Sequence, residues 1–239
     1  MNMQNGATAQ QTHSRAEVTN AFLRSVYNWM AIGLGVTAVV AWGVAANIDV
    51  IAGAVGLGGF KTLFIVAMVA QLGLVFFLSA RINKLSGQTA TGLFIGYSAL
   101  TGFTLSGLLL AYTQTSVVTA FLTTTGMFGA ISLYGLTTKR DLASLGSFCM
   151  MGLFGLIIAM VVNIFVGSSM LAFGISAIGV LIFVGLTAYD TQFLKEMGEN
   201  IPQDDATAVR RGVIMGALKL YLDFINLFIM LLRLIGDRR

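Results

Sequence analysis

The sequence predicts an all-α, polytopic membrane protein that crosses the bilayer as a bundle of seven transmembrane helices. Hydrophobic residues make up 56% of the 239 residues and charged residues only 10%, whereas a soluble domain carries roughly 25% charged residues. The apolar residues also come in long runs, each close to the ~20 residues that a bilayer-spanning helix needs. Too little polar surface remains to face water, so composition and run length together predict the class of protein.

The chain divides into a tail and one membrane domain. We expect residues 1–24, which are rich in polar side chains, to form a disordered N-terminal tail, and residues 25–239 to form a single seven-helix domain. The connection 47–61 contains several glycines and is expected to be a flexible external loop or to hold a short re-entrant piece. The apolar runs place the seven spans near residues 27–46, 62–80, 90–112, 117–136, 145–167, 170–190 and 212–234.

Basic residues gather in alternate connections, which predicts the orientation. The connections between them carry almost no charge, and basic residues favour the cytoplasmic side of a membrane. The N-terminus is therefore expected to be cytoplasmic. The tail 237–239 contains two arginines and conflicts with this orientation if the seventh helix spans fully, so a re-entrant seventh segment is the alternative. The basic residues that set the orientation are Arg15, Arg24, Arg81, Lys84, Lys139, Arg140, Lys195, Arg210 and Arg211.

Several classes of function lack the residues that they need. The net charge of +4 is scattered between apolar runs rather than gathered on one face, so no nucleic-acid partner is expected. A single cysteine, Cys149, excludes a disulfide framework. The one histidine, His13, lies in the polar tail. No cofactor is expected.

Ionisable residues within the apolar runs are few. They are Asp190, Lys219 and Asp223, with Arg81 at the end of the second span. A charged group at the centre of a bilayer costs ~3 kcal/mol on insertion scales, so such a residue is a functional hypothesis by default. Asp190 ends the apolar run of the sixth span and could be a solvated cap. The apolar pattern continues beyond it at Phe193, which favours a buried position.

The seventh span carries its small and polar residues on one stripe. A stripe of this kind must face other helices, so the last helix is predicted to be central. Asp223 lies about 16 Å along the helix from Gly212, near the middle of the membrane. Lys219 could pair with Asp223 one turn away, although this order is the poorer orientation for such a pair. The stripe consists of Gly212, Gly216, Lys219, Asp223 and Asn226.

Two motifs around the aspartates resemble a known family. Residues 220–228, Leu-Tyr-Leu-Asp-Phe-Ile-Asn-Leu-Phe, resemble the last helix of the Bax inhibitor family, the transmembrane Bax-inhibitor-motif proteins. Tyr189-Asp190-Thr191-Gln192 resembles the family's sixth-helix motif, and Arg81 matches its second-helix arginine less specifically. The resemblance extends from about Arg24 to Arg233 and is to bacterial members, which implies a bacterial inner membrane.

The resemblance implies a monomer whose last helix is wrapped by the other six. It further implies a pH-sensitive calcium leak in which Asp190 and Asp223 share a proton, with Arg81 as a latch. Lys219, Asn226, Tyr189 and Tyr221 are expected to support the pair. Two carboxylates in a low dielectric do not both ionise easily, and oxygen ligands suit calcium, the permeant ion expected at Asp190 and Asp223. Some relatives carry a second-helix carboxylate, but this sequence has Gln71 there.

Two other functions remain open. The chain could be a non-conducting modulator that binds other membrane proteins, such as quality-control proteases, besides the lipid bilayer. An intramembrane aspartyl protease would also use two aspartates, and Tyr189-Asp190 resembles one presenilin-like motif. Asp223 is preceded by Tyr221-Leu222 rather than by the Gly-x-Gly of the second motif, and Pro202 is the only proline. We therefore do not expect an enzyme.

Overall fold

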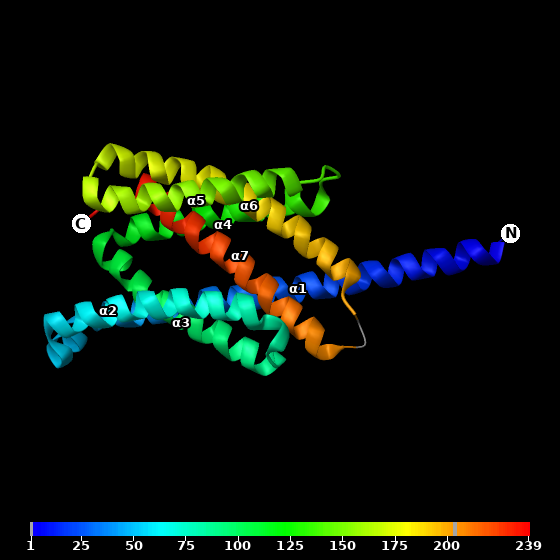
Figure 1. Ribbon diagram of the computed structural model, residues 1–239, viewed down its shortest axis with the longest axis horizontal. Helices are drawn as coiled ribbons and strands as arrows, with labels where there is room; N and C mark the ends of the chain where they lie inside the picture. Colours follow the sequence, from blue (N-terminus) through cyan, green and yellow to red (C-terminus); the bar gives the residue numbers. More distant parts are fainter. Residues whose placement is uncertain (1, 203–204) are drawn as a thin grey trace.

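The computed structural model describes residues 2–202 and 205–239, and its regular elements are helices (Figure 1). Each of the seven α-helices contains a stretch long and apolar enough to cross a membrane, which confirms the predicted seven-span architecture. The elements are α1 (Asn2–Ala46), α2 (Ile48–Arg81), the short 3-10 helix η1 (Ile82–Lys84), α3 (Gly87–Ala111), α4 (Gln114–Thr137), α5 (Ala143–Val166), α6 (Ser169–Asn200) and α7 (Ala206–Ile235).

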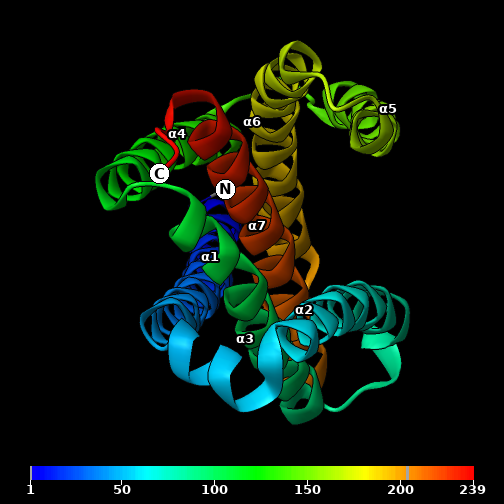
Figure 2. The same cartoon turned by 90° about the vertical axis from the view of Figure 1, so that its left-hand side faces the viewer.

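Helix α7 runs through the centre of the bundle, as predicted (Figure 2). It packs against α1, α3, α4 and α6, while α2 packs mainly on α3 and α5 on α6. The expectation that six helices wrap the last one is therefore wrong in detail, because α2 and α5 form an outer layer. Burial follows the same order: 72% of the most apolar stretch of α7 is buried, against 11% for α2 and α5.

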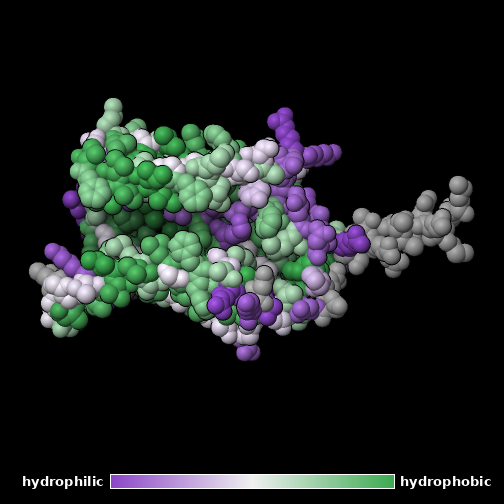
Figure 3. All heavy atoms as spheres, viewed as in Figure 1, coloured by the Kyte–Doolittle hydropathy of each residue, from purple (hydrophilic) through white to green (hydrophobic). Residues whose placement is uncertain are grey.

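The outer helices expose large apolar side chains where a soluble protein would expose polar ones. Phe76 on α2 is 71% exposed and Phe165 on α5 is 85% exposed. Apolar residues cover much of the molecule, and hydrophilic residues gather toward the end nearer the N-terminus (Figure 3). Such a surface is stable only in contact with lipid hydrocarbon.

Glycines allow the inner helices to approach closely. A Cβ on Gly102 of α3 would lie 2.6 Å from the backbone oxygen of Thr37 on α1. A Cβ on Gly216 of α7 would lie 2.7 Å from Leu194 Cδ2 on α6. Small residues drive helix association in membranes because packing replaces the missing hydrophobic effect.

Two segments differ from the sequence-based expectation. The tail 1–24 was expected to be disordered, whereas α1 begins at Asn2 and already packs against the bundle at Thr19, Phe22 and Leu23, which are buried. The connection 47–61 was expected to be a loop, but it is helical from Ile48 and breaks at Gly56. Gly56 adopts φ 72°, a conformation open to glycine because it lacks a Cβ.

The seventh helix is a continuous helix of 30 residues, which is long enough to cross a membrane and does not support the re-entrant alternative. Helix α7 is continuous to Ile235, and the chain ends lie at opposite ends of the bundle (Figure 1). The C-terminal tail then folds onto the α3–α4 turn. Thr113 N donates to Asp237 O at 3.1 Å, and Arg239 N donates to Ala111 O at 3.0 Å. The two arginines of the tail are thereby held at the end of the molecule opposite to the other basic connections.

Candidate functional site

Asp190 and Asp223 both lie inside the bundle, at the interface between α6 and α7. Asp190 is 6% exposed and Asp223 is 5% exposed. The prediction that Asp190 is buried rather than a solvated cap is confirmed, because α6 continues beyond it to Asn200. The two helices that carry these carboxylates pack directly against each other.

Lys219 bridges the two helices. Its Nζ lies 2.7 Å from Asp190 Oδ1, and the lysine and aspartate side chains are 30% and 9% exposed. The same Nζ lies 5.3 Å from the centre of the Phe193 ring, a cation–π contact. Lys219 therefore pairs with the aspartate of α6, and a local pair with Asp223 on its own helix is wrong.

Asp223 is left with an unsatisfied oxygen. Its Oδ2 is buried and has no hydrogen-bond partner among the described residues. A buried polar atom without a partner costs about 1–3 kcal/mol. The site thus holds two carboxylates and one ammonium, with the ammonium committed to Asp190. The structure shows no hydrogen bond between the two aspartates in this arrangement.

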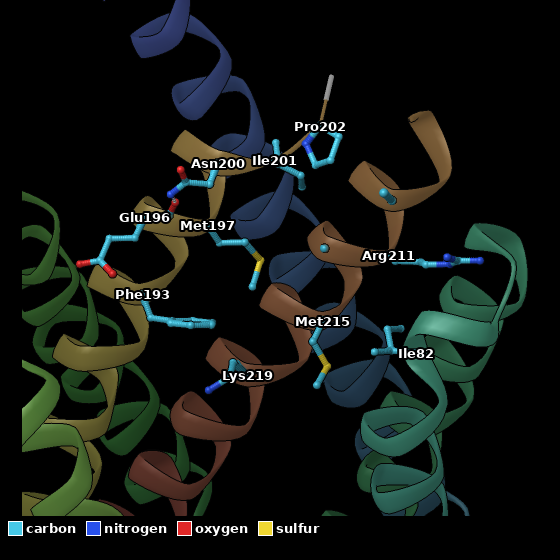
Figure 4. A pocket seen from close by; sticks show the side chains of 12 residues that line it. Ile82, Phe193, Glu196, Met197, Asn200, Ile201, Pro202, Arg211, Met215 and Lys219 are labelled. Atoms are coloured by element: carbon cyan, nitrogen blue, oxygen red, sulfur yellow. Dashed lines mark hydrogen bonds between the residues drawn. The ribbon is translucent and has the colours of Figure 1, made fainter. Parts of the chain in front are cut away.

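An open cavity leads to Lys219 from the end of the bundle that carries the α6–α7 connection. Its volume is about 680 Å³. Phe193 and Met197 on α6 point into the same space as Met215 and Lys219 on α7 (Figure 4). We call this cavity the vestibule. Its lining residues are Ile82, Phe193, Glu196, Met197, Asn200, Ile201, Pro202, Ala208, Arg211, Gly212, Met215 and Lys219.

Arg81 does not reach the aspartates. It lies at the end of α2 and is exposed. In the described part of the chain the ion pair at Asp190 is made by Lys219. The expected latch between Arg81 and a carboxylate is absent from this arrangement because α2 packs on α3, outside the helices that surround α7. Lys219 makes the ion pair with a carboxylate that was expected of Arg81.

The other predicted supporting residues act mainly on packing. Asn226 Nδ2 donates to the backbone oxygen of Leu222 on its own helix at 2.9 Å. Tyr189 lies against Gly146 of α5, where a Cβ would collide with its ring. Neither side chain is hydrogen-bonded to the aspartates, so the structure brings together Asp190, Lys219 and Asp223 only.

Tyr221 anchors α7 to α1 and α3. Thr37 Oγ1 donates to Ser98 O at 2.9 Å, so the Tyr221 hydroxyl, 2.6 Å away, donates to Thr37. The Tyr221 ring makes edge contacts with Phe94 and Tyr97, at centroid distances of 5.7 and 5.9 Å. These contacts hold the helix that carries Asp223 in one rotational position.

Gln71 forms a polar contact that the sequence alone did not assign. Its Nε2 donates to Thr101 Oγ1 at 3.0 Å, and its Oε1 accepts from Thr104 Oγ1 at 3.1 Å. This network joins α2 to α3. The available signal was a single amide in an apolar run, which must find partners inside a membrane.

Comparison with known proteins identifies the family of this chain. The family model described as "Inhibitor of apoptosis-promoting Bax1" matches residues 19–239. The chain belongs to the Bax inhibitor family. It is 51% identical to the Inner membrane protein YbhL of Escherichia coli K12 over 219 residues, which cover 91% of this chain and 92% of that protein. An uncharacterized protein of Deinococcus radiodurans is 46% identical over 99% of this chain and 98% of its own length.

The family match begins at the residue where the chain begins to pack against the bundle. The family match begins at residue 19, and Thr19 is the first residue of α1 that is buried among the described side chains. The membrane domain therefore begins a few residues before the predicted boundary at residue 25.

Proposed function

We propose that this Bax inhibitor family protein is a pH-sensitive cation leak channel, with calcium as the permeant ion. The observation that carries the proposal is the buried cluster of Asp190, Lys219 and Asp223, in which two carboxylates compete for one ammonium. A gate requires two arrangements, and we infer that exchange of Lys219 between the two carboxylates supplies them. Buried ionisable groups on inward-facing helix surfaces commonly mark ion pathways.

The cavities on both sides of the cluster outline a path. The vestibule reaches Lys219 from the end with the α6–α7 connection. A second cavity of about 330 Å³ lies at the other end of α7, where Asn163 of α5 and Arg233 of α7 contribute polar groups. Along α7, Asp223 lies between Lys219, which lines the vestibule, and Arg233, which lines the second cavity. Opening requires α6 and α7 to part at Asp190.

The ligand set suits passage rather than storage of calcium. Calcium prefers six to eight oxygen ligands, and no group of three or more His, Cys, Asp or Glu side chains that could hold a metal occurs in the described residues. Asp190 and Asp223 supply two carboxylates, so hydration water must complete the coordination. Weak binding of this kind allows an ion to leave as readily as it enters.

Protonation of the cluster supplies the pH dependence. With a proton on Asp223 the cluster is neutral, because Lys219 balances Asp190. Loss of that proton leaves a net charge of −1 and two carboxylates facing one ammonium. Helices α3, α4 and α5 contain no charged residue. Of the other charged side chains that line the vestibule, Arg211 has the sign to compensate this negative charge, whereas Glu196 adds to it. The two protonation states therefore favour different packing of α6 on α7.

Calcium flux into proteoliposomes as a function of pH tests the proposal. Asp190→Asn and Asp223→Asn should each flatten the flux–pH curve, because either change removes one of the two coupled carboxylates. The double variant should add little to one single change, since coupled residues are not additive. Asp49→Asn, at an exposed position at the start of α2, is the matched control and should keep the wild-type curve.

Two outcomes would contradict the channel. Single variants that keep the wild-type pH profile would show that the cluster does not sense pH. Absence of flux from the wild-type protein, together with a reproducible membrane-protein partner such as a quality-control protease, would favour a non-conducting modulator. A proteolytic role is less favoured because Asp190 is held by an ammonium rather than by a shared proton.

We further propose that the protein works as a monomer in a bacterial inner membrane, with its N-terminus in the cytoplasm. The name of the E. coli relative supports this membrane. Contacts between basic connections support the orientation. Lys195 Nζ donates to Leu136 O at 2.9 Å, four residues before Arg140, and Arg211 donates to Leu85 O next to Lys84. These cations gather at the end that carries the N-terminus, which the positive-inside rule assigns to the cytoplasm.

A further inference from the structure

A further cavity, distinct from the two described above, lies on another side of α7. It is an apolar slot of about 350 Å³ between α1 and α4, and its floor is made by α3 and α7. We call it the α1–α4 slot. Phe121 of α4 lies 5.7 Å from Phe224 and 6.5 Å from Phe228 between ring centres, which forms one wall of the slot. The slot is lined by Leu34, Thr37, Ala38, Ala41, Trp42, Leu105, Leu108, Leu109, Val117, Val118, Phe121, Leu122, Phe224, Ile225 and Phe228.

The slot cannot hold ordered water. A buried water needs two to four polar partners. Besides the single indole N–H of Trp42, the lining offers one polar group, the Thr37 hydroxyl, which is already occupied by Ser98 O and the Tyr221 hydroxyl. Ala38, Val118 and Leu122 are exposed on the outer surface, so the slot opens sideways into the bilayer. A hydrocarbon chain is the occupant that these walls fit.

A polar mouth adjoins the slot at the C-terminal end of the bundle. This adjoining cavity has a volume of about 440 Å³. It shares Trp42, Leu109, Val117 and Val118 with the slot, and its lining also includes Gln114 and Arg239. Trp42 is 70% exposed, as expected of a tryptophan at the headgroup level of a membrane. The backbone of Arg239 is fixed by its hydrogen bond to Ala111 O. Arg238 turns elsewhere, with its guanidinium 5.8 Å from the centre of the Tyr112 ring.

We propose that the α1–α4 slot and its mouth bind one phospholipid with an anionic headgroup, from the leaflet at the C-terminal end. An acyl chain fills the slot against Phe224, and the headgroup phosphate meets Arg239 and Gln114. Guanidinium matches phosphate geometry with paired hydrogen bonds, and basic pockets between transmembrane helices bind anionic headgroups. This site lies apart from the Asp190–Lys219–Asp223 cluster and does not depend on the proposed channel activity.

Native mass spectrometry of the delipidated full chain tests the site with phosphatidylglycerol and phosphatidylcholine. The wild-type protein should bind one phosphatidylglycerol roughly tenfold more tightly than phosphatidylcholine. Arg239→Gln should remove this preference, while the neighbouring Arg238→Gln should keep it. Glycerol phosphate, which has the head but no chains, should not compete.

Variants of the slot separate chain binding from headgroup binding. Ala38→Phe should fill the slot and weaken binding of both lipids, whereas Val39→Phe, 70% exposed and outside the slot, should bind as the wild type does. If Ala38→Phe does not elute as a single species in gel filtration, Val118→Phe on the opposite wall replaces it. Equal affinity of the wild type for both lipids, or unchanged binding in the filled-slot variant, would overturn the proposal.

Discussion

Lys219 interacts differently with the two aspartates of the site. Its ammonium lies 2.7 Å from Asp190, whereas Asp223 Oδ2 has no hydrogen-bond partner among the described residues. An unpaired buried carboxylate is unstable unless it is protonated or compensated. The residue that sets the pH response is therefore expected to be Lys219, in addition to the two carboxylates.

Replacing Lys219 should move the pH response rather than abolish it. In Lys219→Met the carboxylates lose their nearby positive charge, so the midpoint of the flux–pH curve should rise by roughly one pH unit or more. Lys219→Arg keeps the charge and should stay near the wild-type midpoint. Proteoliposome flux across a pH series measures the shift.

Arg81→Ala is the matched control for that shift. Arg81 is also a cation near the same end of the molecule, but it is exposed on α2. Its removal should leave the midpoint unchanged while Lys219→Met moves it. A shift in Arg81→Ala alone would restore the arginine as the latch that the sequence suggested.

At the site, the sequence identifies the participants but not their pairing. Asp190, Lys219 and Asp223 stand out because charged residues are rare in apolar runs and costly in a membrane. The partner of Lys219 could not be read from the sequence, because it depends on the rotation of α6 against α7. That rotation follows from tertiary contacts such as Leu194 against Gly216, which no local pattern encodes.

At the scale of elements, the spans were predictable and the connections were not. Hydropathy and length predict seven helices, and all seven are present. The connection 47–61 resembled a loop because of its glycines, yet a helix forms from Ile48 and only Gly56 interrupts it. A helix satisfies its backbone N–H and C=O groups internally, which favours helix over loop wherever water is scarce, even in a glycine-rich segment.

The α1–α3 contact gives a prediction for one helix pair. In Gly102→Ala the new methyl group would press on the backbone of Thr37, a neighbour that cannot rotate away. Overpacking of this kind typically costs about 1–3 kcal/mol, so the variant should unfold at a lower temperature than the wild type in the same detergent. Gly96→Ala, on the same helix with open space around it, is the control.

Two results would contradict the prediction for Gly102→Ala. If Gly102→Ala and Gly96→Ala unfold at the same temperature, the close approach of α1 and α3 does not contribute to stability. A loss of stability in Gly96→Ala alone would show that the exposed face of α3 is packed in the membrane.

At the scale of the whole molecule, α7 joins two groups of helices. Helices α1, α2 and α3 pack together on one side, and α4, α5 and α6 on the other (Figure 2). Helix α7 lies between the groups and carries both Asp223 and Lys219. We therefore expect a change in the α6–α7 packing to alter the relative position of the two groups.

The orientation of this bundle decides which side of the membrane the vestibule faces. Cysteine labelling in intact cells, in a Cys149→Ser background, measures it. Lys139→Cys lies in the α4–α5 turn and Thr115→Cys lies near the start of α4, and both positions are exposed. A membrane-impermeant maleimide should label Thr115→Cys and spare Lys139→Cys, because the basic connections favour the cytoplasm. The reverse pattern would place the vestibule outside the cell, and acidification of the medium would then act directly on Lys219 and its two aspartates.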